Sequence, residues 1–136
     1  MTADFTIAVH ALVYLNHKKT FQNSELLAKN VCTHPARIRK VMSVLKKAGL
    51  VEAKEGIDGG YAFCRDPKEV SLRQIADGMN IPFVSASWHS GNINMECLIS
   101  SGMADIMDGV YATLDLECRK ALEKITIDQI DHKIFG

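Results

Sequence analysis

The chain has 136 residues, a length that fits one domain or one domain with an appended element. Its hydrophobic content of 47% is enough for an ordinary globular core, and no apolar run approaches the ~20 residues needed to cross a bilayer. The N-terminus has no basic leader and the four cysteines form no CxxC motif. We therefore predict a cytoplasmic protein that does not associate with a membrane and whose thiols are reduced.

Formal net charge is zero, but the charges are distributed unevenly along the chain. Residues 1–65 carry ten Lys/Arg and five Asp/Glu, whereas residues 96–136 carry four and eight. Between His34 and Lys54 the single acidic residue is Glu52. A concentrated positive field attracts polyanions whatever the total charge. The first half is therefore a candidate for binding nucleic acid, although a solvated helix face would have a similar composition.

Three helices are predicted in the first half of the chain. Apolar residues recur at helical spacing over residues 3–17, and Asn23 is typical of a residue that caps a following helix, here 24–31. The residues of this second helix expected to face the core are Leu26, Leu27 and Val31. Pro35 fits the first turn of a third helix, 35–48, which is amphipathic and basic. Two short helices joined by a tight turn form a helix-turn-helix pattern.

Two short strands are predicted directly after the third helix. The segments "LVEAK" and "YAFCR" are interpreted as strands with alternating inward residues, and "EGIDGG" joins them. Grouped glycines allow a backbone to turn tightly or to approach another group closely. A helix-turn-helix followed by such a hairpin is a winged helix, in which the tip of the wing, here residues 56–61, lies against nucleic-acid backbone. We predict both roles for these glycines.

The second half contains one further short helix and a long late helix. Ser71 can cap the helix "LRQIADGM", and the pattern then disappears into a long loop, which suggests a function for that loop. From about residue 98 to 124 apolar residues follow one helix face, and Thr126 is expected to start a last short helix. We predict a mostly α fold in three regions: a winged helix-turn-helix domain (1–80), a connecting or sensor loop (81–97), and a dimerisation helix with a C-terminal helix (98–136).

Three segments carry a resemblance to a known family. They are "HPARIRKVMSVLKKAGLV", "GIDGGYAF" and "RDPKEVSLRQIADGM". In this order they resemble the Rrf-two family of bacterial winged-helix regulators, which includes IscR, NsrR and CymR, over most of the chain. The resemblance implies a homodimeric transcription factor that binds double-stranded DNA, usually as a repressor, with the late helix pairing the subunits.

The cysteine pattern departs from that of many members of this family. Many relatives hold an iron–sulfur cluster with three cysteines in the loop before the dimerisation helix, whereas here Cys97 stands alone in that region. One thiolate cannot replace the roughly four protein ligands that a cluster needs. We therefore place the chain in the cluster-free branch and predict no metal and no cofactor.

The third helix supplies most of the candidate DNA contacts. The resemblance places a basic pair at Arg39 and Lys40, either of which could donate to guanine O6 and N7. For every candidate the alternative is a solvated surface residue. The candidates are His34, Pro35, Arg37, Arg39, Lys40, Ser43 and Lys47 on this helix, and Gly59, Gly60 and Tyr61 on the wing.

A switch is predicted at one of two cysteines, Cys97 before the late helix or Cys32 in the turn before the third helix. A redox sensor needs a lowered thiol pKa and access to solvent. Cys64 and Cys118 are expected to be small buried residues. An exposed Trp88 would favour the alternative function, a protein-interaction or small-molecule-responsive module without specific operator binding. No catalytic motif is found, so we do not expect an enzyme.

Overall fold

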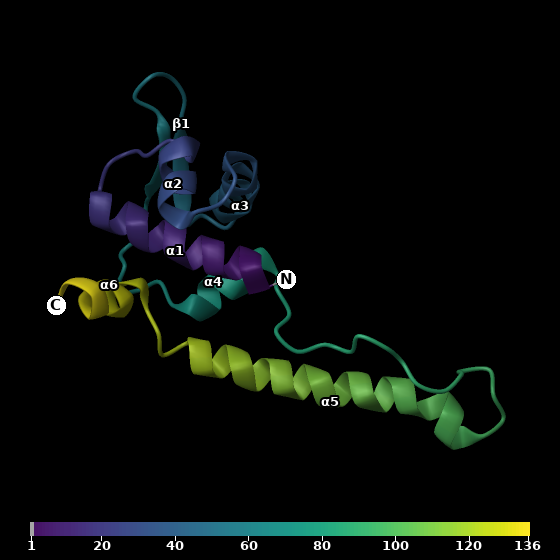
Figure 1. The fold of residues 1–136 in the computed structure, drawn as a ribbon. Coiled ribbons are helices and arrows are strands. Elements are labelled where there is room, and N and C mark those ends of the chain that lie inside the picture. Colours follow the sequence, from purple (N-terminus) through teal and green to yellow (C-terminus); the bar gives the residue numbers. More distant parts are fainter. Residues whose placement is uncertain (1) are drawn as a thin grey trace.

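A computed structural model describes residues 2–136. The elements in chain order are α1 (Thr2–Lys18), α2 (Ser24–Val31), α3 (Pro35–Lys47), β1 (Val51–Lys54), β2 (Gly60–Phe63), α4 (Leu72–Met79), α5 (Leu98–Leu122) and α6 (Ile127–Phe135). Figure 1 shows α1 to α4 and the β-hairpin packed into one body, here called the winged head, from which α5 extends. The predicted winged helix-turn-helix with a long late helix is confirmed.

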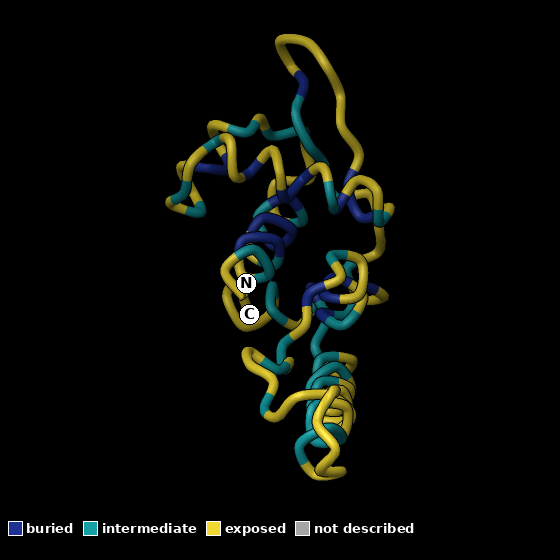
Figure 2. The backbone as a smooth tube through the Cα atoms, turned by 90° about the vertical axis from the view of Figure 1, so that its right-hand side faces the viewer, coloured by how far each residue is buried: buried dark blue, intermediate teal, exposed yellow. Residues whose placement is uncertain are grey.

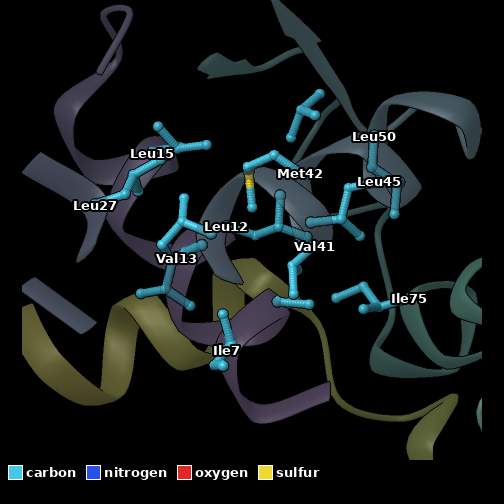
Figure 3. Close-up of a cluster of buried hydrophobic side chains, with 14 of the residues drawn as sticks. Ile7, Leu12, Val13, Leu15, Leu27, Val41, Met42, Leu45, Leu50 and Ile75 are labelled. Carbon is cyan, nitrogen blue, oxygen red and sulfur yellow. The ribbon is translucent and has the colours of Figure 1, made fainter. Parts of the chain in front are cut away.

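The core of the winged head lies between α1 and α3. Ala8, Ala11 and Leu12 of α1 are fully buried because the two small residues let neighbouring helices approach closely. The predicted apolar stripe of α3 is also buried, and Figure 3 shows Val41 and Met42 beside Leu12 of α1. The stripe consists of Ile38, Val41, Met42 and Leu45.

Three helices, α2, α4 and α6, begin where a polar capping residue in the sequence predicts a helix start. The Asn23 side chain accepts a hydrogen bond from the Leu26 N–H at 2.9 Å and so caps α2. Ser71 and Thr126 each form a reciprocal capping box with a glutamine three residues later, at the starts of α4 and α6. Local chemistry therefore fixes where these elements start.

Three expectations about local structure are wrong. Leu26 is 46% exposed, because α2 is short and turns only Leu27 and Ala28 fully toward the core. The hairpin strands do not alternate in burial: Val51 alone is buried, because the two-stranded sheet projects from the head (Figure 2). The late helix ends at Leu122 instead of about residue 124.

The end of the chain returns to the head. The backbone pairs antiparallel between Ser71 and Thr126, and the N–H of Leu72 donates to the Ile125 carbonyl at 2.8 Å. This pairing lays α6 against α1 on the side away from α3 (Figure 1). Residues 81–97 form no helix or strand and run back along α5 toward its far end. Among residues 2–136, no helix has the length and apolar character needed to cross a bilayer.

Candidate nucleic-acid interface

The outer surface of α3 carries the predicted basic residues. Because the apolar stripe faces inward, Arg37, Arg39, Lys40, Ser43 and Lys47 are all exposed, and we call this set the basic face of α3. In Figure 1, α3 and the wing lie on the side of the head opposite α5. The basic face is therefore open and is covered by neither α5 nor α6.

Two arginines of the basic face have partners in the neighbouring helices. Arg37 forms an ion pair with Asp4 of α1 at 3.0 Å, and both side chains are partly exposed. The Arg39 guanidinium donates to the Ser24 hydroxyl at 3.2 Å. Exposed pairs of this kind contribute at most about 1 kcal/mol, so they orient the side chains without preventing them from changing partner. Sequence reasoning missed Asp4, which lies 33 positions from Arg37.

The start of α3 lies where Pro35 predicts it. Pro35 is the first helical residue and His34 occupies the N-cap position. The His34 side chain makes no capping hydrogen bond, whereas its carbonyl accepts from the N–H groups of Arg37 and Ile38. Its imidazole is therefore exposed beside the basic face and takes no part in capping the start of the helix.

The glycines of the wing are required by the chain's own backbone. A Cβ on Gly59 would lie 2.1 Å from the Lys54 carbonyl oxygen, and one on Gly60, which has φ +136°, would lie 2.3 Å from that of Gln22. Tyr61 exchanges two backbone hydrogen bonds with Gln22, at 2.8 and 2.9 Å. Contacts of Gly59, Gly60 and Tyr61 with DNA remain a prediction, because their geometry is already explained by this pairing.

The exposed tip of the wing lies between the two strands, at residues 55–58. It carries two carboxylates, Glu55 and Asp58, and a fully exposed Ile57. Lys54 lies at the base of the tip with its ammonium 5.6 Å from the centre of the Phe21 ring. The wing therefore differs in charge from the basic face of α3.

The four cysteines occupy different elements. Cys97 is the N-cap of α5 and is exposed, and the N–H groups of Ser100 and Ile99 lower the pKa of its thiol. Cys32 ends α2 in a left-handed conformation, with φ 65°, and is exposed as well. The expectation of buried cysteines is wrong for Cys64, because it follows β2 on the open side of the hairpin and is exposed. Cys118 is partly buried on α5.

The fold and the basic face together define a winged helix-turn-helix, a class of DNA-binding domain. The family model described as "Rrf2: Iron-dependent Transcriptional regulator" matches residues 1–133. The chain therefore belongs to the Rrf2 family of transcriptional regulators, as the three quoted segments predict.

Several individual proteins are similar to the chain over nearly its whole length. YwnA of Bacillus subtilis, named as an HTH-type transcriptional regulator, is 23% identical over 130 residues, which cover 95% of each chain. A structure named as a transcriptional regulator from Lactobacillus plantarum superposes with a TM-score of 0.84 at 23% identity, covering 100% of this chain and 92% of the other. The B. subtilis cysteine regulator CymR gives 0.70 at 14% identity, covering 98% and 96%. These proteins are named as regulators and not as enzymes, which agrees with the predicted absence of catalysis.

The residues of this chain do not fit the iron cofactor that the family's description suggests. Cys97 and Cys118 lie at opposite ends of one helix, about 30 Å apart at 1.5 Å per residue. Cys32 and Cys64 belong to the winged head. Within residues 2–136 no group of three His, Cys, Asp or Glu side chains is arranged to hold a metal ion. A cluster-free regulator remains our prediction.

Proposed function

We propose that the protein is a homodimeric transcriptional repressor that binds a two-fold operator. The basic face of α3 would enter the major groove, and the wing, residues 56–61, would approach the phosphate backbone. The observation that carries this proposal is the open basic face on a winged head whose core is complete without it. Arg39 and Lys40 are the residues that we expect to read bases, while Lys47 contacts phosphate.

The long helix α5 supports the homodimer. None of its 25 residues is buried, and apolar side chains are exposed along it, with Leu98 85% exposed and Ile106 60% exposed. An apolar surface of this extent is typical of a protein–protein interface. Pairing of α5 with its copy in a second subunit would present two basic faces to half-sites about 34–36 Å apart.

A gel-shift measurement with the protein's own upstream DNA tests the proposal. Changing Arg39→Ala together with Lys40→Ala is expected to weaken binding at least 100-fold, because each base contact contributes about 1–3 kcal/mol. The matched control is Lys120→Ala with Lys124→Ala, two exposed lysines that are not on the head. Equal affinities for both double variants would contradict the proposal. In vitro transcription from the bound fragment then distinguishes repression from activation.

Oxidation of Cys97 is the switch that we propose for this regulator. The exposed thiolate would attack hydrogen peroxide, forming an S–O bond as the O–O bond breaks, and the hydroxide released would take up a proton and leave as water. The product, a neutral sulfenic acid, interacts less strongly with the N–H groups at the start of α5. Peroxide should therefore release wild-type protein from DNA but not the Cys97→Ser variant, with Cys32→Ser as the control. Release of the Cys97→Ser protein would eliminate Cys97 as the sensor.

Two observations favour the alternative function, a module that responds to a small molecule or a partner protein. Trp88 is 77% exposed in the loop before α5. A groove of about 610 Å³ lies between α1 and α6, lined mainly by apolar side chains, and this volume is in the range of small-ligand sites. Specific retention of the upstream DNA would favour the repressor over this alternative.

A further inference from the structure

The joint between α5 and the winged head is polar, although most joints between helices are apolar. α5 has no buried residue, and the part of it that packs against the apolar core is its last residue, Leu122, which stays partly exposed. Two charged side chains near its C-terminal end are nevertheless well covered: Arg119 is 14% exposed and Asp115 is 17% exposed. These two side chains face the head, and their contacts show how α5 is held.

Asp115 binds the first residues of the loop that leaves α4. One carboxylate oxygen accepts the N–H groups of Phe83 at 2.7 Å and of Val84 at 3.0 Å, and the other accepts from the Arg119 guanidinium at 2.9 Å. The Val84 N–H is the main cause of a lowered pKa of Asp115, with Arg119 adding to it against the opposing effect of burial. The carboxylate is therefore ionised at neutral pH and holds two backbone amides.

Arg119 connects the Asp115 carboxylate to α4 and to the loop that follows it. Its guanidinium also binds the carboxylate of Asp77 on α4 and the backbone carbonyl of Ile81. It lies 5.7 Å from the centre of the Phe83 ring, and the centre of that ring lies 5.1 Å from the centre of the Phe5 ring of α1 in an edge-to-face arrangement. One side chain of α5 thus contacts α4, the loop and an aromatic pair that reaches α1.

We propose that Asp115 and Arg119 are positioning residues that fix the angle between α5 and the winged head, and thereby determine which half-site spacing the dimer accepts. This inference rests on the proposed function, in which α5 pairs the subunits. Inserting one base pair between two half-sites moves them about 3.4 Å apart and rotates one by about 35°. A rigid joint keeps the two heads at one separation and orientation, so the dimer binds such a site weakly. A loosened joint lets the heads move apart and rotate to match the site.

Several hydrogen bonds from one guanidinium fix the angle between α5 and the head better than a single contact would. The planar guanidinium presents its donors in a fixed fork, so its bonds specify orientation as well as distance. A second ion pair, Arg73 with Glu123, also joins α4 to α5, but its carboxylate is 53% exposed and is accessible to water. The covered pair is therefore the part of the joint most sensitive to substitution.

The test compares wild-type protein with the Asp115→Ala and Arg119→Lys variants on a set of DNA duplexes. The duplexes carry the retained upstream site with its centre unchanged, or longer or shorter by one or two base pairs. Wild-type affinity should fall at least 30-fold for a change of one base pair, whereas the variants should bind all spacings within about fivefold. Arg119→Lys keeps the charge and removes the fork, so it tests geometry if Asp115→Ala is too unstable.

The matched control is Glu117→Gln with Lys120→Gln, an exposed ion pair on the same helix. This double variant should discriminate between spacings as wild type does. A general loss of stability would weaken binding to every duplex equally, so the ratio between spacings reports positioning specifically. Variants that keep the wild-type ratio would overturn the proposal and leave the dimeric regulator intact.

Hydrogen exchange without DNA provides a readout that does not depend on the proposed function. In Asp115→Ala the amides of Phe83 and Val84 should exchange at least tenfold faster than in wild type, while those of α1 remain protected. Unchanged exchange would show that the carboxylate does not hold the loop and would overturn the proposal by itself. If wild type bound none of the duplexes, the proposed function would fail instead, and the role in spacing would fail with it.

Discussion

The winged head and α5 differ in how completely their own chain covers them. The head contains a continuous cluster of buried side chains, whereas α5 has 25 residues and buries none of them. They also differ in charge, since the basic excess lies in residues 1–65 and the acidic excess in residues 96–136. The head is therefore a finished fold that presents a charged surface, whereas the apolar side chains of α5 stay exposed on the single chain. Mutations should separate these two roles.

The largest effect is expected in the core of the head. Ile38 is fully buried under α1, so Ile38→Ala removes apolar contacts and leaves a cavity. We expect a loss of about 2–5 kcal/mol in the free energy of unfolding, measured by urea denaturation and circular dichroism. Ile57→Ala, at the exposed wing tip, serves as the control and should change it by less than about 0.5 kcal/mol. Similar losses for the two variants would contradict a core that contains Ile38 and excludes the wing tip.

The second effect concerns α5, where burial is expected only between subunits. Ile106→Asp places a charge in the middle of the exposed apolar stripe. We expect the dissociation constant of the homodimer to rise at least 100-fold, about 3 kcal/mol, in sedimentation experiments. Ala112→Asp adds the same charge at an exposed position on the opposite side of the same helix and should leave the dimer nearly unchanged. If Ile106→Asp protein stayed dimeric at low concentration, the pairing surface would lie elsewhere.

The sequence predicted those features that depend on local chemistry and periodicity. The stripe of α3 and the caps at Asn23, Ser71 and Thr126 were all predictable, because each depends on residues within about one helical turn. The exposure of Leu26 was not predictable. Apolar residues three or four positions apart show which face of a helix is apolar, but not how much of a short helix the neighbouring elements cover.

The parts of the candidate site that could not be predicted join residues distant in sequence. Asp4 contacts Arg37 and Asp115 contacts Phe83, pairs that are 33 and 32 positions apart. Such contacts follow from helix packing, which no short motif encodes. Gly60 shows an intermediate case: its sequence context predicted a turn, but not that the missing side chain makes room for the backbone of Gln22.

A smaller effect is expected where the start of α4 pairs with the start of α6. The Ser71 hydroxyl accepts from the Gln74 N–H at 3.2 Å, and this residue also pairs with Thr126. Ser71→Ala should lower the free energy of unfolding by about 1 kcal/mol, because a helix donor loses its acceptor. Ser71→Asp, which can still cap, is the control and should retain most of the stability in the same urea titration. Equal losses would show that capping by the side chain does not account for the loss of stability.

The smallest effect is expected at the wing, whose acidic tip contrasts with the basic face of α3. Asp58 lies at the exposed tip, and its carboxylate would be repelled by phosphate if the wing approached DNA. Asp58→Asn removes that repulsion, so we expect DNA affinity to rise about two- to fivefold at low salt, with the gain shrinking as salt screens the charges. The control is Asp128→Asn on α6, on the side of α1 away from α3, which should leave affinity unchanged. Fluorescence anisotropy at two salt concentrations measures both variants. An unchanged affinity for Asp58→Asn at low salt would mean that the wing stays away from the backbone, and that the basic face of α3 alone holds the DNA.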